Sequence, residues 1–163
     1  MNHHASVETL RKITFLSKTD DKYLEPLAQM SRELAFQTHD IIFSEHEPAK
    51  DAYLVESGEI SLVVCTPQAG CRQLGTVGPG ELLGWSGVLE QRRVSATAQT
   101  LKPTRVVAFD GHELAKFCRE NPQFGLEFML RTARVLTERL YATRIQLLDL
   151  AGIHLPEMSL ESD

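Results

Sequence analysis

Residues 34–109 are divided into short apolar segments separated by turn residues, and this pattern limits the possible folds most strongly. Within residues 60–64, Ile60, Leu62 and Val64 stand at alternate positions, as in a strand with one buried face. Many short strands at close spacing are typical of a sandwich, a barrel or a jelly roll. We therefore expect a mainly β fold with flanking helices. The predicted strands cover residues 41–43, 53–55, 60–64, 73–77, 95–99 and 105–109.

Helical patterns flank this β region. One helix is predicted from Ser17 or Thr19, as its N-cap, to about Gln29, and another over residues 112–120. A longer helix is expected to begin at Asn121-Pro122, because proline suits the first helical position.

This long helix carries two apolar stripes, and the first has the three-and-four spacing of a coiled-coil seam. We expect one stripe to pack on the β domain and the other on a second copy, giving a homodimer through residues 126–150. The alternative is that both stripes pack within one chain. The first stripe is Leu126, Met129, Ala133, Leu136, Leu140, Thr143, Leu147 and Leu150, and the second is Phe128, Val135, Ala142, Ile145 and Leu148.

Composition and charge restrict the class of protein. The chain has 163 residues and 42% hydrophobic content, which suits one domain with appended helices. Its net charge of −5 argues against a polyanion as partner. No apolar run approaches the roughly 18 residues of a membrane span, and the N-terminus does not resemble a secretory signal. We expect a cytoplasmic protein with no membrane contact. The expected divisions are an N-terminal segment (1–16), a β domain with an N-terminal helix (17–118), a long helix (119–151) and an acidic, disordered tail (152–163).

The three cysteines match no zinc-ligand spacing, and no metal is expected. Cys65 and Cys71 bracket residues 66–70, so a hairpin would bring them face to face. Cytosolic thiols usually stay reduced, which is the expectation here, with a redox switch as the alternative.

The glycine-rich segment 77–87 is the strongest candidate for a ligand site. After a Gly-Pro-Gly turn come Glu81, a predicted short apolar helix and then Arg92 and Arg93 before a strand. A helix N-terminus attracts anions, arginine adds a full charge, and a glutamate accepts hydrogen bonds from sugar hydroxyls. Trp85 either fills the core or covers a ligand. The pattern indicates a site for a small anionic ligand.

Four segments, in order, resemble the cyclic-nucleotide-binding domain family, the sensor fold of the cAMP receptor protein. Residues 40–49 (DIIFSEHEPA) are similar to the family's G-D-x-I-F-x-E-G-D-x-A, and residues 53–60 (YLVESGEI) to its Y-x-V-x-S-G-x-V. Residues 80–98 correspond to the phosphate-binding cassette, and the long helix corresponds to the dimerisation helix of bacterial members. The resemblance, over about residues 14–151, implies a β jelly roll (double-stranded β-helix) followed by a C-terminal dimerisation helix.

The resemblance also implies roles for residues of the cassette. Gly80 and Glu81 match the family's Gly-Glu, whose glutamate holds the ribose 2′-hydroxyl, and Leu82 follows them. Ser95 matches the small residue that binds the phosphate, and Ala96 follows it.

The family's phosphate-binding arginine directly precedes that small residue, where this chain has Val94. Strand alternation would turn Arg93 to the opposite face, but a bulged loop would bring it to the phosphate. The segment between Glu81 and Ser95 is longer than in most members, which allows such a bulge, and Arg92 is the other candidate.

On the long helix, residues 139–144 resemble the region that approaches the glutamate and the purine. Arg139 and Thr143 are therefore predicted ligand contacts, although Thr143 could instead bond the carbonyl one turn back. The predicted function is a non-enzymatic sensor that binds cAMP or a similar cyclic nucleotide and signals through its dimer helix to a protein effector.

A helix-turn-helix would not fit in the few residues after Leu150, so direct DNA binding is not expected.

Three alternatives to the sensor stay open. A ligand-free dimeric interaction module would explain Val94. A haem sensor would use His112, His154, Cys65 or Cys118, and a cupin-type metalloprotein would use residues near His39, residues 45–47 and Glu56.

Overall fold

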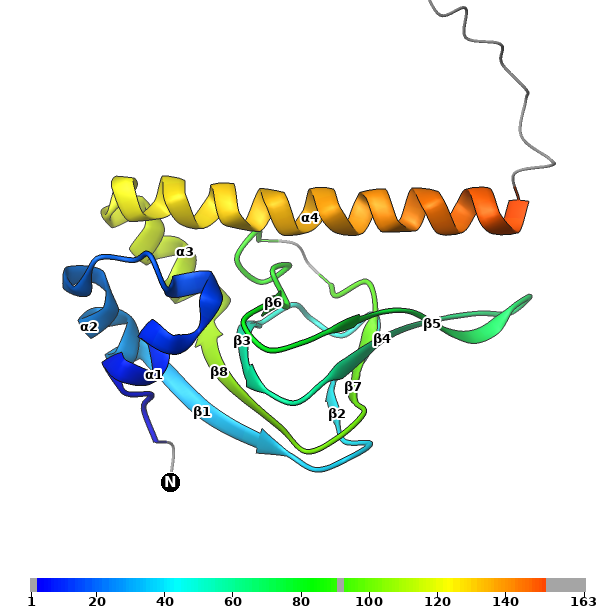
Figure 1. Ribbon diagram of the computed structural model, residues 1–163, viewed down its shortest axis with the longest axis horizontal. Coiled ribbons are helices and arrows are strands. Elements are labelled where there is room, and N and C mark those ends of the chain that lie inside the picture. Colours follow the sequence, from blue (N-terminus) through cyan, green and yellow to red (C-terminus); the bar gives the residue numbers. More distant parts are fainter. Residues whose placement is uncertain (1–2, 91–92, 152–163) are drawn as a thin grey trace, which may run out of the picture.

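The computed structural model describes residues 3–90 and 93–151, and it has the mainly β architecture with flanking helices that the sequence predicts (Figure 1). The helices are α1 (Val7–Lys12), the 3-10 turn η1 (Thr14–Leu16), α2 (Asp21–Met30), α3 (Gly111–Glu120) and α4 (Pro122–Ala151). The strands are β1 (Ser31–Phe36), β2 (Ile41–Phe43), β3 (Asp51–Ser57), β4 (Ile60–Thr66), β5 (Gly70–Val77), β6 (Leu82–Leu83), β7 (Thr97–Thr100) and β8 (Thr104–Asp110).

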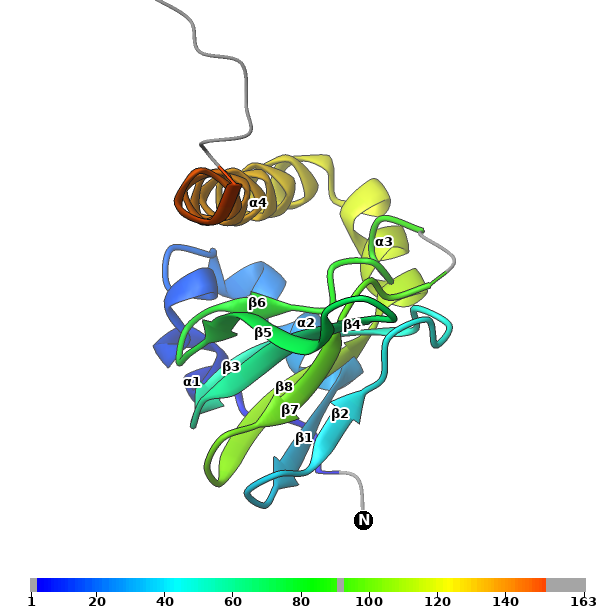
Figure 2. The ribbon, with the colours of Figure 1, turned by 90° about the vertical axis from the view of Figure 1, so that its right-hand side faces the viewer.

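The strands form two four-stranded antiparallel sheets, in the orders β1-β8-β3-β6 and β2-β7-β4-β5. Figure 2 shows the sheets as the two walls of a roll. Helix α4 lies above the roll and is viewed nearly along the helix axis. One core cluster, including Val55, Ile60 and Val106, fills the space between the sheets. A second cluster, including Leu24 and Leu114, joins the helices to the first sheet.

Two strands lie where the sequence did not predict them. β1 was missed because its Ser-Arg-Glu-Leu-Ala-Phe sequence is half polar. The short apolar helix expected after the Gly-Pro-Gly turn is wrong, because Leu82 and Leu83 form strand β6, paired with Leu54 and Tyr53 of β3. Without that helix, its N-terminus cannot contribute to anion binding.

The helix ends are set by local caps. Asp20, and neither Ser17 nor Thr19, caps α2 by accepting a hydrogen bond from the backbone N–H of Lys22. Thr19 is buried and its hydroxyl accepts a hydrogen bond from Arg131 of α4. Helix α4 begins at Pro122, as predicted.

Helix α4 lies across one end of the roll and continues beyond α3 (Figure 1). Phe128 of the second stripe is buried in the core. The exposed members on the single chain come from both stripes: Leu126, Leu140, Leu147 and Leu150 of the first, and Ile145 and Leu148 of the second. No helix among residues 3–90 and 93–151 combines the length and apolar character of a membrane span. The tail predicted at 152–163, His154 and Arg92 fall outside the described residues.

Candidate functional site

A cavity of about 470 Å³ lies between the roll and the C-terminal half of α4. Helix α4 contributes Arg139, Ala142, Thr143 and Gln146 to its lining. The roll contributes mostly apolar side chains, together with the small polar groups of Thr76, Ser86 and Ser95. The apolar side chains of the roll that line the cavity are Phe43, Leu62, Val64, Leu74, Leu83, Trp85, Val94 and Ala96.

Four of the residues predicted from the sequence meet at this cavity. Ser95 and Ala96 line it from the segment before β7, and Arg139 and Thr143 line it from α4. The Thr143 hydroxyl donates to the carbonyl of Arg139 at 2.9 Å, which is the local alternative considered for it, so only its acceptor capacity is left for a ligand.

Gly80, Glu81 and Leu82 lie outside the cavity lining. Gly80 has a φ of +84°, and a Cβ there would lie 2.7 Å from the Thr14 hydroxyl. The glycine therefore allows the N-terminal segment at Thr14 to pack closely against this turn. The Glu81 carboxylate accepts a hydrogen bond from the N–H of Gly78, within its own turn. The side chain of Leu82 is buried in the helix-side core.

The loop before β7 turns Val94 inward and Arg93 outward. Val94 is 7% exposed and lines the cavity, while the guanidinium of Arg93 donates to the carbonyl of His46. Backbone hydrogen bonds between Val94 and residues 46 and 47 hold this alternation in place. The cavity therefore has valine where the family resemblance implies arginine.

Sequence reasoning missed Gly84, which lines the cavity in the position where Gly80 was expected. Trp85, for which both a core role and a ligand-covering role were considered, lines the cavity beside it. Gly84 has a φ of +73°, and a Cβ there would lie 2.7 Å from the carbonyl oxygen of Asp51. The excess length of the loop between Glu81 and Ser95 was the signal, because taking Gly84 as the cassette glycine shortens that loop.

Arg139 connects α4 with the loop that follows β6. Its guanidinium carbon lies 4.4 Å from the centre of the Trp85 ring, and its Nη2 donates to the Leu82 carbonyl at 3.0 Å. Burial lowers the pKa of Arg139, and the nearby Glu81 carboxylate opposes this shift. Further along the helix, Gln146 donates to the carbonyl of Leu74 in β5 at 3.1 Å. Two side chains of α4 thus span the cavity.

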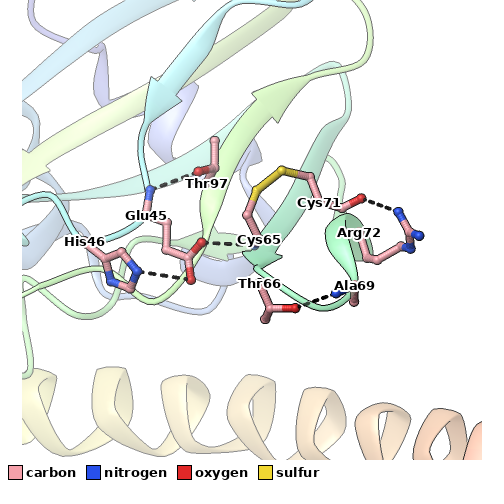
Figure 3. The surroundings of a disulfide bond; sticks show 8 residues. All are labelled: Glu45, His46, Cys65, Thr66, Ala69, Cys71, Arg72 and Thr97. Atoms are coloured by element: carbon pink, nitrogen blue, oxygen red, sulfur yellow. Dashed lines mark hydrogen bonds and ion pairs between the residues drawn. A yellow bond between two sulfur atoms is a disulfide. The ribbon is translucent and has the colours of Figure 1, made fainter.

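The β4–β5 hairpin brings Cys65 and Cys71 face to face, as expected, and a disulfide joins them (Figure 3). The expectation of reduced thiols is therefore wrong for this pair in the structure. Glu45 accepts a hydrogen bond from the N–H of Cys65 at 3.1 Å, next to the disulfide. The third cysteine, Cys118, is buried, and burial raises its pKa to about 11.

The residues considered for a metal form no ligand cluster in the part of the chain that the structure describes. Within residues 3–90 and 93–151, no three His, Cys, Asp or Glu side chains lie together as metal ligands. His39 and His46 both have φ of +70° at turns outside the strands. This left-handed backbone conformation is typical of turn residues, so both histidines are assigned a loop role.

Comparisons with known proteins identify the family to which this fold belongs. Residues 33–121 match the family described as cyclic nucleotide-binding domain. The CRP-like cAMP-activated global transcriptional regulator of Mycobacterium tuberculosis is 22% identical over 149 residues, which cover 91% of this chain and 65% of that protein. The chain thus spans about 65% of the length of the curated relatives it matches.

Solved structures show the same fold. The crystal structure of a candidate cyclic nucleotide-binding protein from Geobacter metallireducens superposes with a TM-score of 0.72 at 28% identity, covering 83% of this chain and 98% of the other. A cyclic nucleotide-binding domain from Methylobacillus flagellatus gives 0.73 at 20% identity, covering 94% and 84%. Because the matched residues run from β1 to just beyond α3 and make up more than half of the chain, this protein belongs to the cyclic nucleotide-binding domain family.

Proposed function

We propose that this chain is a non-enzymatic regulatory sensor that binds a cyclic nucleotide in the cavity under α4. One observation carries the proposal: the cavity has the Ser95–Ala96 segment on one side and α4 on the other. An occupant would therefore contact both the roll and the helix. cAMP is the first candidate, because the related Mycobacterium tuberculosis regulator is described as cAMP-activated.

The signal would leave through α4. A ligand that fills the cavity competes with the two contacts that hold the helix over it, Arg139 to Leu82 and Gln146 to Leu74. Ligand binding would bias α4 between two positions. Leu126 and Leu140 are 62% and 51% exposed, which suits a helix that pairs with a second copy. We propose a homodimer through residues 126–150, read by a protein effector in the cytoplasm.

A thermal-shift panel of cAMP, cGMP and a cyclic dinucleotide tests the proposal. A ligand at 100 times its dissociation constant stabilises the native state by about 2.7 kcal/mol. For a chain of this size, that raises the melting temperature by about 5–10 °C. Ala142→Trp, which places an indole at the cavity, should abolish the shift, and Glu138→Trp, an exposed position on the same helix outside the lining, should keep it.

A ligand-free dimeric interaction module is the second candidate. It is favoured by Val94 in the cavity wall and by the outward hydrogen bond of Arg93. Absence of a shift with every nucleotide, together with a dimer by sedimentation equilibrium, would support this candidate over the sensor.

A further inference from the structure

The charge in the cavity is arranged asymmetrically. Among the described residues of its lining, Arg139 has the only charged side chain, and it enters from α4. The opposite wall is largely apolar, with Phe43, Leu62 and Val94 in the lining, and its polar groups are uncharged. A ligand in this cavity therefore meets a cation at the helix and a hydrophobic surface at the sheets.

Arg139 has unused hydrogen-bonding capacity in this setting. Its Nη2 bonds the Leu82 carbonyl and its guanidinium lies over Trp85. Its Nη1 is shielded from solvent and has no hydrogen-bond partner among residues 3–90 and 93–151. Glu81 is the nearby carboxylate, but the N–H of Gly78 holds it in its own turn. A shielded cationic donor without an acceptor is unfavourable, and an anionic ligand atom would satisfy it.

We propose that Arg139 is the anion-binding group of the cavity, and that the ligand is an amphipathic organic anion. Its charged group meets α4, and its apolar or planar body lies against the sheets. This inference rests on the proposed sensor function, since it concerns the same cavity. In the wild-type chain, a cyclic nucleotide that binds here would direct its phosphate towards Arg139, because Val94 offers it no cation.

Binding of the ligand's charged group would also change the contacts that hold α4 against the roll. The guanidinium that would bind the anion is the group that connects α4 to Leu82 and Trp85. Anion binding would change these contacts directly, without a relay through other residues. Arg139 thus acts both as the binding group and as the point where α4 senses occupancy.

The test uses a charged probe and its neutral isostere, 4-phenylbutyrate and 4-phenylbutyramide. Both are titrated calorimetrically into the full chain, with fluorescence of Trp85, the one tryptophan in the sequence, as second readout. Wild type should bind the acid at least about tenfold more tightly than the amide, because only the acid forms a charge-assisted pair. Arg139→Met should remove this preference and Arg139→Lys should retain most of it. Arg134→Met, an exposed change on the same helix outside the cavity lining, should leave it unchanged.

Equal binding of acid and amide by wild type, binding of neither, or a preference that survives in a folded Arg139→Met protein would overturn the inference. The cyclic nucleotide panel separates this result from failure of the sensor proposal. Nucleotide binding that is equal in wild type and Arg139→Met keeps the sensor and rejects the role of Arg139. Acid binding that depends on Arg139, with no response to any cyclic nucleotide, supports the inference and rejects the nucleotide as ligand.

Discussion

Replacing Val94 with arginine would return to the cavity the cation that the family resemblance places before Ser95. Val94 is 7% exposed and lines the cavity, so the new guanidinium would enter it from the wall opposite α4. Arg93 cannot supply this charge, because strand alternation turns it outward to the His46 carbonyl.

The free and bound states should respond in opposite directions. Without ligand, loss of the buried valine lowers the free energy of unfolding by about 1.5 kcal/mol, because apolar surface returns to water. That corresponds to a fall in melting temperature of about 3–6 °C. With a cyclic nucleotide, the introduced guanidinium gives the phosphate a second cationic partner in the same cavity, in addition to Arg139. A charge-assisted hydrogen bond to it contributes about 1.5–3 kcal/mol. Affinity should therefore rise by about 10- to 100-fold.

Calorimetric titration of cAMP and cGMP into Val94→Arg, with melting curves of the free protein, measures both effects. Val94→Met is the matched control, because it adds bulk without charge and should give no gain in affinity. A folded Val94→Arg protein that binds nucleotides no better than wild type would refute the assignment of residue 94 to the ligand-facing wall.

Three stability predictions test other parts of the fold. Gly125→Ala places a Cβ 2.4 Å from the backbone oxygen of Cys118, where α3 meets α4, so urea denaturation should show a loss of about 1–3 kcal/mol. Gly75→Ala, whose Cβ meets nothing within 4 Å, should change little, and equal losses would contradict the packing argument. Removing the disulfide with C65S/C71S should lower stability by about 2 kcal/mol, since the bond closes a short loop. Reductant should lower the melting temperature of wild type but not of this variant, and no effect on wild type would mean that the bond does not form. Burial raises the pKa of Cys118 to about 11, above that of the unfolded thiol, so the native state retains this proton longer and stability falls as pH rises from about 9 to 11. Cys118→Ala should show a smaller fall in melting temperature over that range, and an equal fall would exclude the thiol as its source.

Much of the architecture could be predicted because it depends on local pattern. The spacing of apolar residues indicated β4 and β8, and Pro122 marked the start of α4. β1 could not be predicted, because it packs on β8 through a sequence that is half polar. β6 could not be predicted either, because two leucines are too few to show a period and only their pairing with β3 makes them a strand.

The candidate site was partly predictable from the family resemblance. That resemblance singled out Ser95 and Ala96 in the cassette and Arg139 and Thr143 on the long helix, and all four line the cavity. The helix residues lie one turn apart, so they face the same side of α4. The cassette glycine was misplaced, because two glycines of one segment, Gly80 and Gly84, look equivalent in sequence.

The sequence by itself determined the strands other than β1 and β6, the long helix and the two apolar stripes on it, because these follow from spacing along the chain. Only the tertiary structure decided that Gly84 and Trp85 reach the cavity while Glu81 stays in its turn. That choice depends on contacts between distant residues: Gly84 fits against the backbone of Asp51, and Trp85 meets Arg139 of α4. Contacts of this kind leave no periodic trace in a single sequence, so only the folded chain identifies which residues meet a ligand.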